Sequence, residues 1–375
     1  MSDVDLSYLH EAERLSDITY ILEVTPRYLK GPAFNIEKIY PKSGLFKATE
    51  AYPEFSRLAG FVNLDHFYVL NTCGRLWQLK AFWTNFLLLL FLVRQKFGAI
   101  HWAWPPNVYE FPIYFLRKRM LLTVHDPFPH TAHDSFIVRL RRKMAFWLIP
   151  RLIILNKAQR EDFINFYHID PRRIIDSQLS CYTYLQCVKP DTAAAPTSRY
   201  LLFAGRISPY KGLDYLLPAM EKIHAELPDC KLIVAGGGKY HFDIAKYQAA
   251  DYIDIRNRYI PDEELVALIS NCAFMVCPYT DATQSGVVMS AFAFNKPVIA
   301  TNVGALPEMV RHQHFGLIVS ERDSDALGAS IIKLWTSPQL QRSFSEQIQQ
   351  AYSTGNMSWR SNAVLIYQAY CKRIQ

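Results

Sequence analysis

The sequence predicts an α/β protein with two Rossmann-like, doubly wound domains that face a cleft. The chain has 375 residues, which is enough for two domains of about 150 residues each. Short apolar runs alternate with segments of helical spacing, a pattern typical of parallel sheets covered by helices. A small, polar, proline-bearing segment at residues 189–198 predicts a linker between the domains.

The second domain, residues 197–350, has the clearer pattern. We expect a buried strand at each short apolar run: Tyr200–Ala204, Lys231–Ala235, Phe274–Cys277, Val298–Thr301 and Leu317–Val319. The apolar stripe that predicts the helix after the first strand is Leu213, Leu216, Leu217 and Met220. Asp262 is the expected N-cap of a later helix.

The first domain, residues 1–190, repeats the pattern less cleanly. Its expected strands are Ile18–Val24, His66–Leu70, Ala99–Trp104, Met120–His125, Arg151–Leu155 and Arg173–Asp176. Its expected helices are Leu76–Arg94, Asp134–Trp147 and Ala158–Tyr167. Two such domains would place ligands at the carboxyl ends of their strands.

The start of the chain is unusual for a doubly wound domain. Residues 3–14 have helical spacing and precede the first apolar run, Ile18–Val24. We therefore expect the opening strand of such a domain to be missing, the alternative being a domain permuted in detail. A missing strand would leave buried backbone groups of a central strand unpaired, at roughly 1–3 kcal/mol each.

Composition excludes several classes of protein. Hydrophobic residues make up 50% and charged residues 20%, so wholesale disorder is excluded. The formal net charge of +7 suits anionic small molecules or surfaces but is too weak to indicate nucleic acid. Seven scattered cysteines without a Cys-x-x-Cys pair argue against a disulfide framework or zinc ribbon, and favour a cytoplasmic protein with reduced thiols. The run Phe86–Val93 is too short to span a membrane and predicts a buried helix.

The strongest functional signal is the loop after the strand 200–204. Gly205 and Gly212 would let the backbone approach a ligand, and a helix begins directly afterwards. Arg206 can grip phosphate oxygens and Lys211 supplies a second positive charge. The loop therefore predicts a diphosphate cradle, the alternative being a solvated loop with two surface cations.

A second signal spans residues 278–308. A strand runs into a polar loop, then a helix, a strand and a further loop rich in glycine and proline. The backbone N–H groups of Ser285, Gly286 and Val287 would lie at the helix start, where they could meet an anion or sugar hydroxyls.

These two segments resemble the donor domain of family 4 retaining glycosyltransferases, which have the GT-B fold. The resemblance extends over residues 199–375, and more weakly over 122–127 and 151–180. It implies a hexosyltransferase that takes a sugar from a UDP- or GDP-linked donor and gives it to a glycan or lipid-linked acceptor, as in polysaccharide biosynthesis. It also implies that Arg206 and Lys211 stabilise the leaving diphosphate without a metal or other cofactor. Residues 351–375 would form a helix that crosses back to the first domain.

The resemblance assigns further site residues. His125, at a strand end, matches a family histidine close to the reacting centre, and with Asp126 it is a catalytic candidate; the alternative is a core histidine. The family's pair of glutamates is missing, since Ser290 stands at the second position and Ala282 or Asp281 at the first. The remaining expected donor contacts are Tyr259, Gln284, Ser285, Gly286, Val287, Ser290 and Glu308. For Glu308 the alternative is that it only fixes the loop in which it lies.

Three patterns are assigned to structure rather than to a metal or dinucleotide. The histidines and aspartates of residues 125–134 match no zinc signature. Asp323 and Asp325 open a helix, so N-capping explains them better than Mn²⁺ or Mg²⁺ binding. The glycines 236–238 predict a tight turn, which in the family lies near the donor.

One segment of the first domain combines basic and apolar residues, a composition that can bind a membrane surface. Residues 139–149 mix cations with large apolar side chains, and Arg117–Arg119 add positive charge. Peripheral contact with an anionic inner membrane face is one interpretation, and a helix that buries its apolar side is the other. Two rival functions also remain: a GT-B nucleotide-sugar epimerase, and a binding subunit or degenerate transferase.

Overall fold

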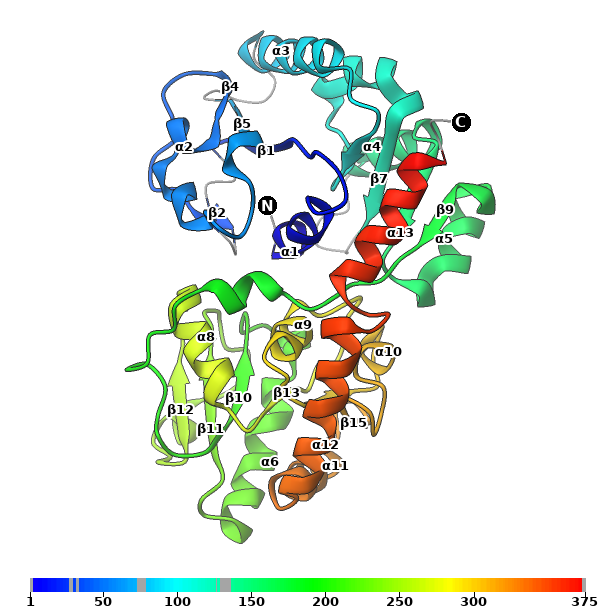
Figure 1. The fold of residues 1–375 in the computed structure, drawn as a ribbon. Coiled ribbons are helices and arrows are strands. Elements are labelled where there is room, and N and C mark those ends of the chain that lie inside the picture. The colour runs from blue at the N-terminus through cyan, green and yellow to red at the C-terminus, as the bar shows by residue number, and fades with distance from the viewer. Residues whose placement is uncertain are drawn as a thin grey trace. The chain divides into compact units, whose positions relative to one another are not determined.

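The computed structural model describes residues 3–26, 30–31, 34–72, 79–125, 127–128 and 136–372 (Figure 1). The chain divides into two compact units, Met1–Leu179 with Trp359–Gln375, and Ser180–Ser358. The boundary between the two units therefore falls at Leu179 and Ser180, before residues 189–198. That segment, predicted to be the linker, is instead bonded to the second unit: Asp191 N–H donates to the Glu263 carbonyl at 3.0 Å. Arg256 also donates to the Ala194 carbonyl at 2.7 Å.

The second unit is built on one six-stranded sheet with the order β12-β11-β10-β13-β14-β15. Every neighbouring pair in it is parallel. The strands are β10 (Tyr200–Ala204), β11 (Lys231–Ala235), β12 (Ile253–Arg256), β13 (Phe274–Cys277), β14 (Val298–Thr301) and β15 (Gly316–Val319). Five of these strands were predicted, four of them with the observed bounds. The edge strand β12 was missed because its charged residues interrupt the apolar run.

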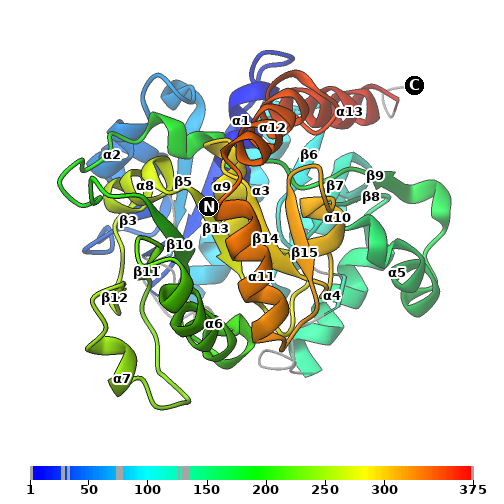
Figure 2. The same cartoon turned by 90° about the horizontal axis from the view of Figure 1, so that it is seen from below.

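Helices cover this sheet in the order that the alternating pattern predicts. They are α6 (Leu213–Glu226), α7 (Ala245–Gln248), α8 (Asp262–Asn271), α9 (Gly286–Ala293), α10 (Leu306–Val310), α11 (Ser324–Trp335) and α12 (Pro338–Gln349). A π-helical segment, η9 (Gln350–Thr354), follows α12. Helices α6 and α11 pack against each other on one face of the sheet (Figure 2). Asp262 is the first residue of α8, and Pro261 rather than Asp262 is its N-cap.

In the first unit, the described strands form two larger sheets and a short antiparallel pair. One sheet has the order β1-β5-β4, with β4 antiparallel, and the other has the order β6-β7-β8-β9 with parallel neighbours. The strands are β1 (Tyr20–Val24), β2 (Lys30–Gly31), β3 (Phe34–Asn35), β4 (Gly44–Lys47), β5 (Phe67–Asn71), β6 (Ile100–Trp102), β7 (Met120–Val124), β8 (Arg151–Ile154) and β9 (Ile174–Asp176). The sequence did not predict β2 and β3, which have two residues each, or β4, in which only Leu45 and Phe46 are apolar.

The α-helices of the first unit flank these sheets. They are α1 (Asp3–Ala12), α2 (Ala48–Ala51), α3 (Leu79–Gln95), α4 (Phe136–Leu148), α5 (Arg160–Tyr167) and α13 (Trp359–Cys371). A long 3₁₀ segment, η3 (Val108–Arg119), lies between β6 and β7 in the sequence. The predicted opening helix is confirmed, and the described residues 3–19 contain no strand.

The C-terminal helix α13 belongs to the first unit, where it packs on α1. The hydroxyls of Tyr8 and Tyr370 form a hydrogen bond of 2.8 Å. His101 lies between α13 and β7: its Nδ1 is 2.9 Å from the Tyr370 hydroxyl and its Nε2 is 2.7 Å from Thr123 Oγ1. Burial lowers the pKa of His101 to about 4, so the ring is neutral at pH 7. These bonds tie both ends of the unit's chain to its sheet.

Helix α3 differs from the sequence prediction. The run Phe86–Val93 was expected to be buried, yet Phe86 and Val93 are 37% and 50% exposed. The physical reason is the helical period, because a continuous apolar run places some of its residues on every side of a helix. In the described part of the chain, no helix is both long enough and apolar enough to cross a membrane.

Candidate functional site

The predicted diphosphate loop starts where two glycine turns pack against each other. Gly205 follows β10 with a φ of +115°, a conformation that favours glycine. Ile207 N–H donates to the Gly237 carbonyl at 3.1 Å, which joins this loop to the turn after β11. A Cβ on Gly236 would lie 2.0 Å from the Gly205 carbonyl oxygen. A Cβ on Gly238 would likewise lie 2.0 Å from the Ile207 carbonyl oxygen, so Gly236 and Gly238 are required for backbone contact with the loop.

The loop ends at the N-terminus of α6. Gly212 has a φ of +67° and is the N-cap of that 14-residue helix. A Cβ on Gly212 would lie only 1.7 Å from the Pro278 carbonyl oxygen, so the chain after β13 touches the helix start directly. The first N–H groups of a helix and its dipole favour an anion at this end.

Lys211 is the buried cation of the loop, with 9% of its surface exposed. Its Nζ lies 3.6 Å from the ring centroid of Tyr279 and 5.1 Å from that of Tyr210, two cation–π contacts. In the described part of the chain, no carboxylate forms an ion pair with Nζ. Burial lowers the pKa of Lys211 to about 8, with Cys277 opposing the shift and the positive charge of Arg206 adding to it. Among the residues that the structure describes, Lys211 is thus a desolvated cation without an acidic partner.

Arg206 has the opposite environment. Its side chain is exposed to solvent at the start of the same loop. The structure therefore offers one accessible guanidinium and one buried ammonium along a single loop. An anion bound here can meet the planar donor fork of arginine and the point charge of lysine.

The second predicted loop meets the first at several points. Tyr279, whose ring lies against the Lys211 ammonium, comes two residues after the end of β13, and Thr280 N–H donates to the Tyr210 carbonyl at 2.8 Å. A Cβ on Gly205 would lie 3.3 Å from Val287 Cγ2, so the start of α9 faces the end of β10. Ser285 is the N-cap of α9: its Oγ accepts from Val288 N–H at 3.4 Å and donates to the Tyr279 hydroxyl at 3.3 Å. The structure thus brings Gly205, Lys211, Ser285 and Val287 into one region of the second unit.

The positions of the missing glutamate pair are occupied by short side chains. Ser290 is buried, and its Oγ donates to the Gly286 carbonyl at 3.0 Å within α9. That hydroxyl proton is engaged by the helix, although the oxygen can still accept a hydrogen bond. The loop after β14 packs against the backbone at Ala282, because a Cβ on Gly304 would lie 1.5 Å from the Ala282 carbonyl oxygen. In the same loop, Ala305 N–H donates to the Thr283 carbonyl at 3.3 Å.

The other expected donor contacts are placed in the same unit. Glu308 is exposed on the short helix α10, and Gln284 and Gly286 are partly buried beside Ser285. Tyr259 is 67% exposed in the loop between β12 and α8. Asn257 joins that loop to the glycine turn, because its side chain accepts from Gly238 N–H at 2.9 Å.

His125 lies in the first unit, directly after β7. Its ring stacks on Trp104, with the ring centroids 4.6 Å apart and the planes at 17°. Asp126 lies outside the described residues, as do His130, His133 and Asp134. The N-cap assigned to Asp323 is confirmed, since its Oδ1 accepts from Ala326 N–H at 2.8 Å.

Sequence reasoning missed Tyr279 and Pro278. Both follow the apolar strand β13, and the motif itself gave no reason to expect a buried aromatic partner for Lys211. The only available signal was position, because residues at the carboxyl end of a central parallel strand lie where such folds bind ligands.

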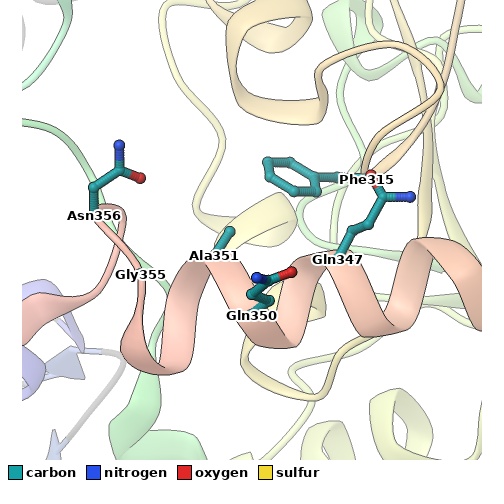
Figure 3. A pocket seen from close by; sticks show the side chains of 6 residues that line it. All are labelled: Phe315, Gln347, Gln350, Ala351, Gly355 and Asn356. Carbon is teal, nitrogen blue, oxygen red and sulfur yellow. The ribbon is translucent and has the colours of Figure 1, made fainter.

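A pocket of about 290 Å³ lies elsewhere in the second unit, at the junction of α12 and η9 (Figure 3). The side chains that line it are uncharged, and they are Phe315, Gln347, Gln350, Ala351 and Asn356, together with Gly355. It contains none of the residues predicted for the donor site.

Comparison with known proteins agrees with the fold and the loop. Residues 198–337 match the family model described as "Glycosyl transferases group 1". The D-inositol 3-phosphate glycosyltransferase of Mycolicibacterium gilvum is 28% identical over 195 residues, which cover 48% of this chain and 43% of that protein. The chain thus spans less than half the length of the curated relatives it matches.

Solved structures match over nearly the whole chain. A sucrose-phosphate synthase from Thermosynechococcus elongatus has a TM-score of 0.66 at 18% identity, covering 97% of this chain and 91% of that one. The Anabaena protein HepE, solved in complex with UDP, has a TM-score of 0.67 at 15% identity, covering 99% and 96%. The fold is α/β with two Rossmann-like domains, the GT-B architecture, and the group 1 glycosyltransferase model matches the second of them.

The environment of Lys211 predicts a pH dependence for anion binding. A bound diphosphate stabilises the protonated amine, so binding takes up a proton where the free protein has lost it. Because the pKa of Lys211 is about 8, the affinity for UDP should be constant near pH 7 and fall as the pH rises above 8. Calorimetric titration of UDP between pH 6.5 and 9.5 measures this, with Lys211→Arg as the control that should remain flat. Equal slopes for the two proteins would contradict the prediction.

Proposed function

We propose that this protein is a retaining, family 4 type glycosyltransferase that moves a sugar from a UDP- or GDP-linked donor to a glycan or lipid-linked acceptor. The observation that carries the proposal is the loop of Gly205–Gly212, which combines Arg206, the buried Lys211 and the N-terminus of α6. HepE, a relative in fold, was solved with UDP, which supports a nucleotide diphosphate at this loop.

The proposed mechanism is mainly electrostatic. Breaking the bond between the sugar and the diphosphate develops negative charge on the leaving phosphate. Arg206 and Lys211 would stabilise that charge, and the low polarity around Lys211 would strengthen its effect. The departing phosphate oxygen would accept the proton of the acceptor hydroxyl. His125 would contact the donor sugar, with Trp104 holding its ring in place.

The test is nucleotide affinity in a variant that leaves the fold unchanged. Arg206→Ala should weaken UDP or GDP binding about 10- to 150-fold, the range for one charged contact of about 1.5–3 kcal/mol. Arg342→Ala removes an exposed arginine of α12, outside the loop, and should leave the affinity unchanged. Equal affinities of Arg206→Ala and the unmodified protein, measured by calorimetry, would overturn the proposal.

A transfer assay separates the proposal from its rivals. Purified protein is given UDP- and GDP-sugars with glycan and lipid-linked acceptors, and the product is identified by mass and anomeric configuration. A transferase forms a glycosidic product with retained configuration, an epimerase changes the donor sugar without an acceptor, and a binding subunit does neither.

We further propose that transfer needs no metal ion. Two cations are available to stabilise the leaving group, so transfer should continue at full rate in EDTA. The measurement compares initial rates with EDTA, and with Mn²⁺ or Mg²⁺ added back. A loss of at least tenfold that either metal restores would contradict this expectation.

The proposal places the enzyme in the cytoplasm, in peripheral contact with the anionic inner face of a membrane. The segment of residues 139–149 supports it, since α4 leaves Arg139, Lys143 and Trp147 exposed. A lipid-linked acceptor would be met at that face.

A further inference from the structure

Three neighbouring elements of the first unit leave large apolar side chains in solvent. Helices α3 and α4 both pack against η3 (Figure 1). On α4, Phe136, Leu140 and Trp147 form an exposed stripe at the helical repeat, and Trp147 is 75% exposed. On η3, Phe115 is 80% exposed. The full set of exposed apolar residues on the three elements is Phe82, Trp83, Phe86, Val93, Phe111, Phe115, Phe136, Ile137, Leu140 and Trp147.

Soluble surfaces rarely concentrate so many large apolar side chains in one region. Aromatic side chains are preferred where a membrane interface meets water, because a ring can sit at the level of the headgroups. The helical stripes suit shallow insertion, in which one face of a helix enters the lipid and the other rests on the protein. The exposed apolar side chains therefore indicate that a lipid bilayer covers this part of the protein.

The charges of the same three elements indicate which lipids this surface would bind. Helix α3 has two Lys or Arg residues, η3 has three and α4 has four, whereas Glu110, which is buried, is the single acidic residue of all three. The chain has 41 Lys and Arg against 34 Asp and Glu, so removing these elements leaves 32 against 33. The excess positive charge of the protein thus comes from the three elements that expose the aromatic residues, and Arg117, Lys118, Arg139 and Lys143 are exposed on them. Cations beside an apolar face attract anionic headgroups.

We infer that α3, η3 and α4 form a membrane-docking surface that inserts its exposed aromatic side chains into a bilayer of anionic lipids. The inference deepens the proposed function, since it names the partner surface from which a lipid-linked acceptor would be taken. The docking itself needs neither donor nor transfer. To the helix and the basic residues Arg117–Arg119 anticipated from the sequence it adds α3, which the apolar pattern assigned to the interior, and the exposed aromatic residues of η3.

The test is flotation of the full chain with vesicles of phosphatidylcholine, with and without 30% phosphatidylglycerol. We expect binding to the anionic vesicles, weaker binding to pure phosphatidylcholine, and loss of binding as salt is raised. Phe115→Ser with Trp147→Ser should lower the partition coefficient at least tenfold, whereas Phe166→Ser, an exposed aromatic of α5, should not. Replacing Arg117, Lys118 and Lys143 by glutamate should lower it at least tenfold. Replacing the exposed Lys189, Lys231 and Lys372 by glutamate makes the same change in net charge and should have a much smaller effect.

The outcomes separate the docking from the activity. UDP affinity, measured without vesicles, should be equal in all these variants, so a protein that fails to bind UDP but floats with vesicles refutes only the proposed function. Absence of flotation, or equal losses in the test and control variants, overturns the docking surface. A concentration-dependent dimer that disappears in Phe115→Ser with Trp147→Ser, without vesicle binding, would show that a second copy covers this face and would overturn it as well.

Discussion

Replacing Lys211 by methionine should weaken the proposed UDP binding and at the same time stabilise the folded protein. The ammonium is buried against Tyr279 and has no carboxylate partner in the described residues. Its pKa of about 8 in the folded chain, against 10.5 ordinarily, corresponds to a cost of about 3 kcal/mol. That cost is fully present at pH 7, where the lysine is protonated in both the folded and unfolded states, and it disappears as the pH rises from 8 towards 10.5.

Methionine fills a similar volume and carries no charge, so the desolvation cost is removed while the packing is kept. The lost cation–π contacts offset about 1–2 kcal/mol of the gain. We therefore expect an increase in stability of about 1–2 kcal/mol at pH 7, seen as a higher melting temperature. UDP affinity should fall about 10- to 150-fold through loss of the charged contact.

Arg206→Met is the matched control. Its guanidinium is exposed, so the variant should lose UDP affinity without a change in melting temperature. Thermal unfolding and calorimetry on the same preparations give both quantities. A Lys211→Met protein that melts lower and binds UDP normally would mean that the lysine serves the fold rather than the ligand.

Gly212→Ala should destabilise the second unit by about 3–5 kcal/mol, because the new methyl group has no room. The Cβ would lie 1.7 Å from the Pro278 carbonyl oxygen, and the backbone has a φ of +67°. Strain at such a φ costs roughly 1 kcal/mol, and displacing the backbone at Pro278 accounts for the rest. Since that displacement moves the N-terminus of α6 away from Tyr279, UDP affinity should fall as well.

Two other glycines distinguish the cost of backbone strain from the cost of the contact with Pro278. Gly60 has a φ of +85° and no heavy atom within 4 Å of an added Cβ, so Gly60→Ala should cost only the roughly 1 kcal/mol of backbone strain. Gly328 lies in α11, where a Cβ would make ordinary contacts at 3.9 Å, so Gly328→Ala should be neutral or stabilising by about 0.5–1 kcal/mol. Urea denaturation measures the free energy of unfolding of the three variants, and hydrogen exchange reports the stability of each unit separately. Equal effects of Gly212→Ala and Gly60→Ala would show that the contact with Pro278 is not required.

The sequence predicted the central strands best. The strands β10, β11, β13 and β14 have the predicted bounds, because strands buried on both faces are continuous apolar runs. The missed strands β4 and β12 each have only two apolar residues, flanked by Gly44 and Lys47 in β4 and separated by Asp254 in β12, so their apolar pattern is too weak to detect. The loop of Gly205–Gly212 was found for a similar reason, since glycine and cations between a strand and a helix form a local pattern.

Which side chains are buried was decided by tertiary contacts. The sequence predicted the same role for Arg206 and Lys211, whereas the fold exposes the side chain of Arg206 and buries that of Lys211 against Tyr279. Tyr279 lies 68 positions further along the chain, just after β13, a strand that neighbours β10. No local pattern records such a contact, because it depends on the order of strands in the sheet.

The sequence by itself therefore determined the α/β fold class, the alternation of strands and helices and the cationic glycine loop, all of which follow from local periodicity and residue type. Only the tertiary structure decided that residues 189–198 pack on the second unit, that Lys211 is desolvated, and that α3 exposes Phe86 and Val93. These features depend on which surfaces come together when distant segments pack. Burial, and with it the pKa of a group and the character of a surface, belongs to that packing rather than to the neighbouring residues in the chain.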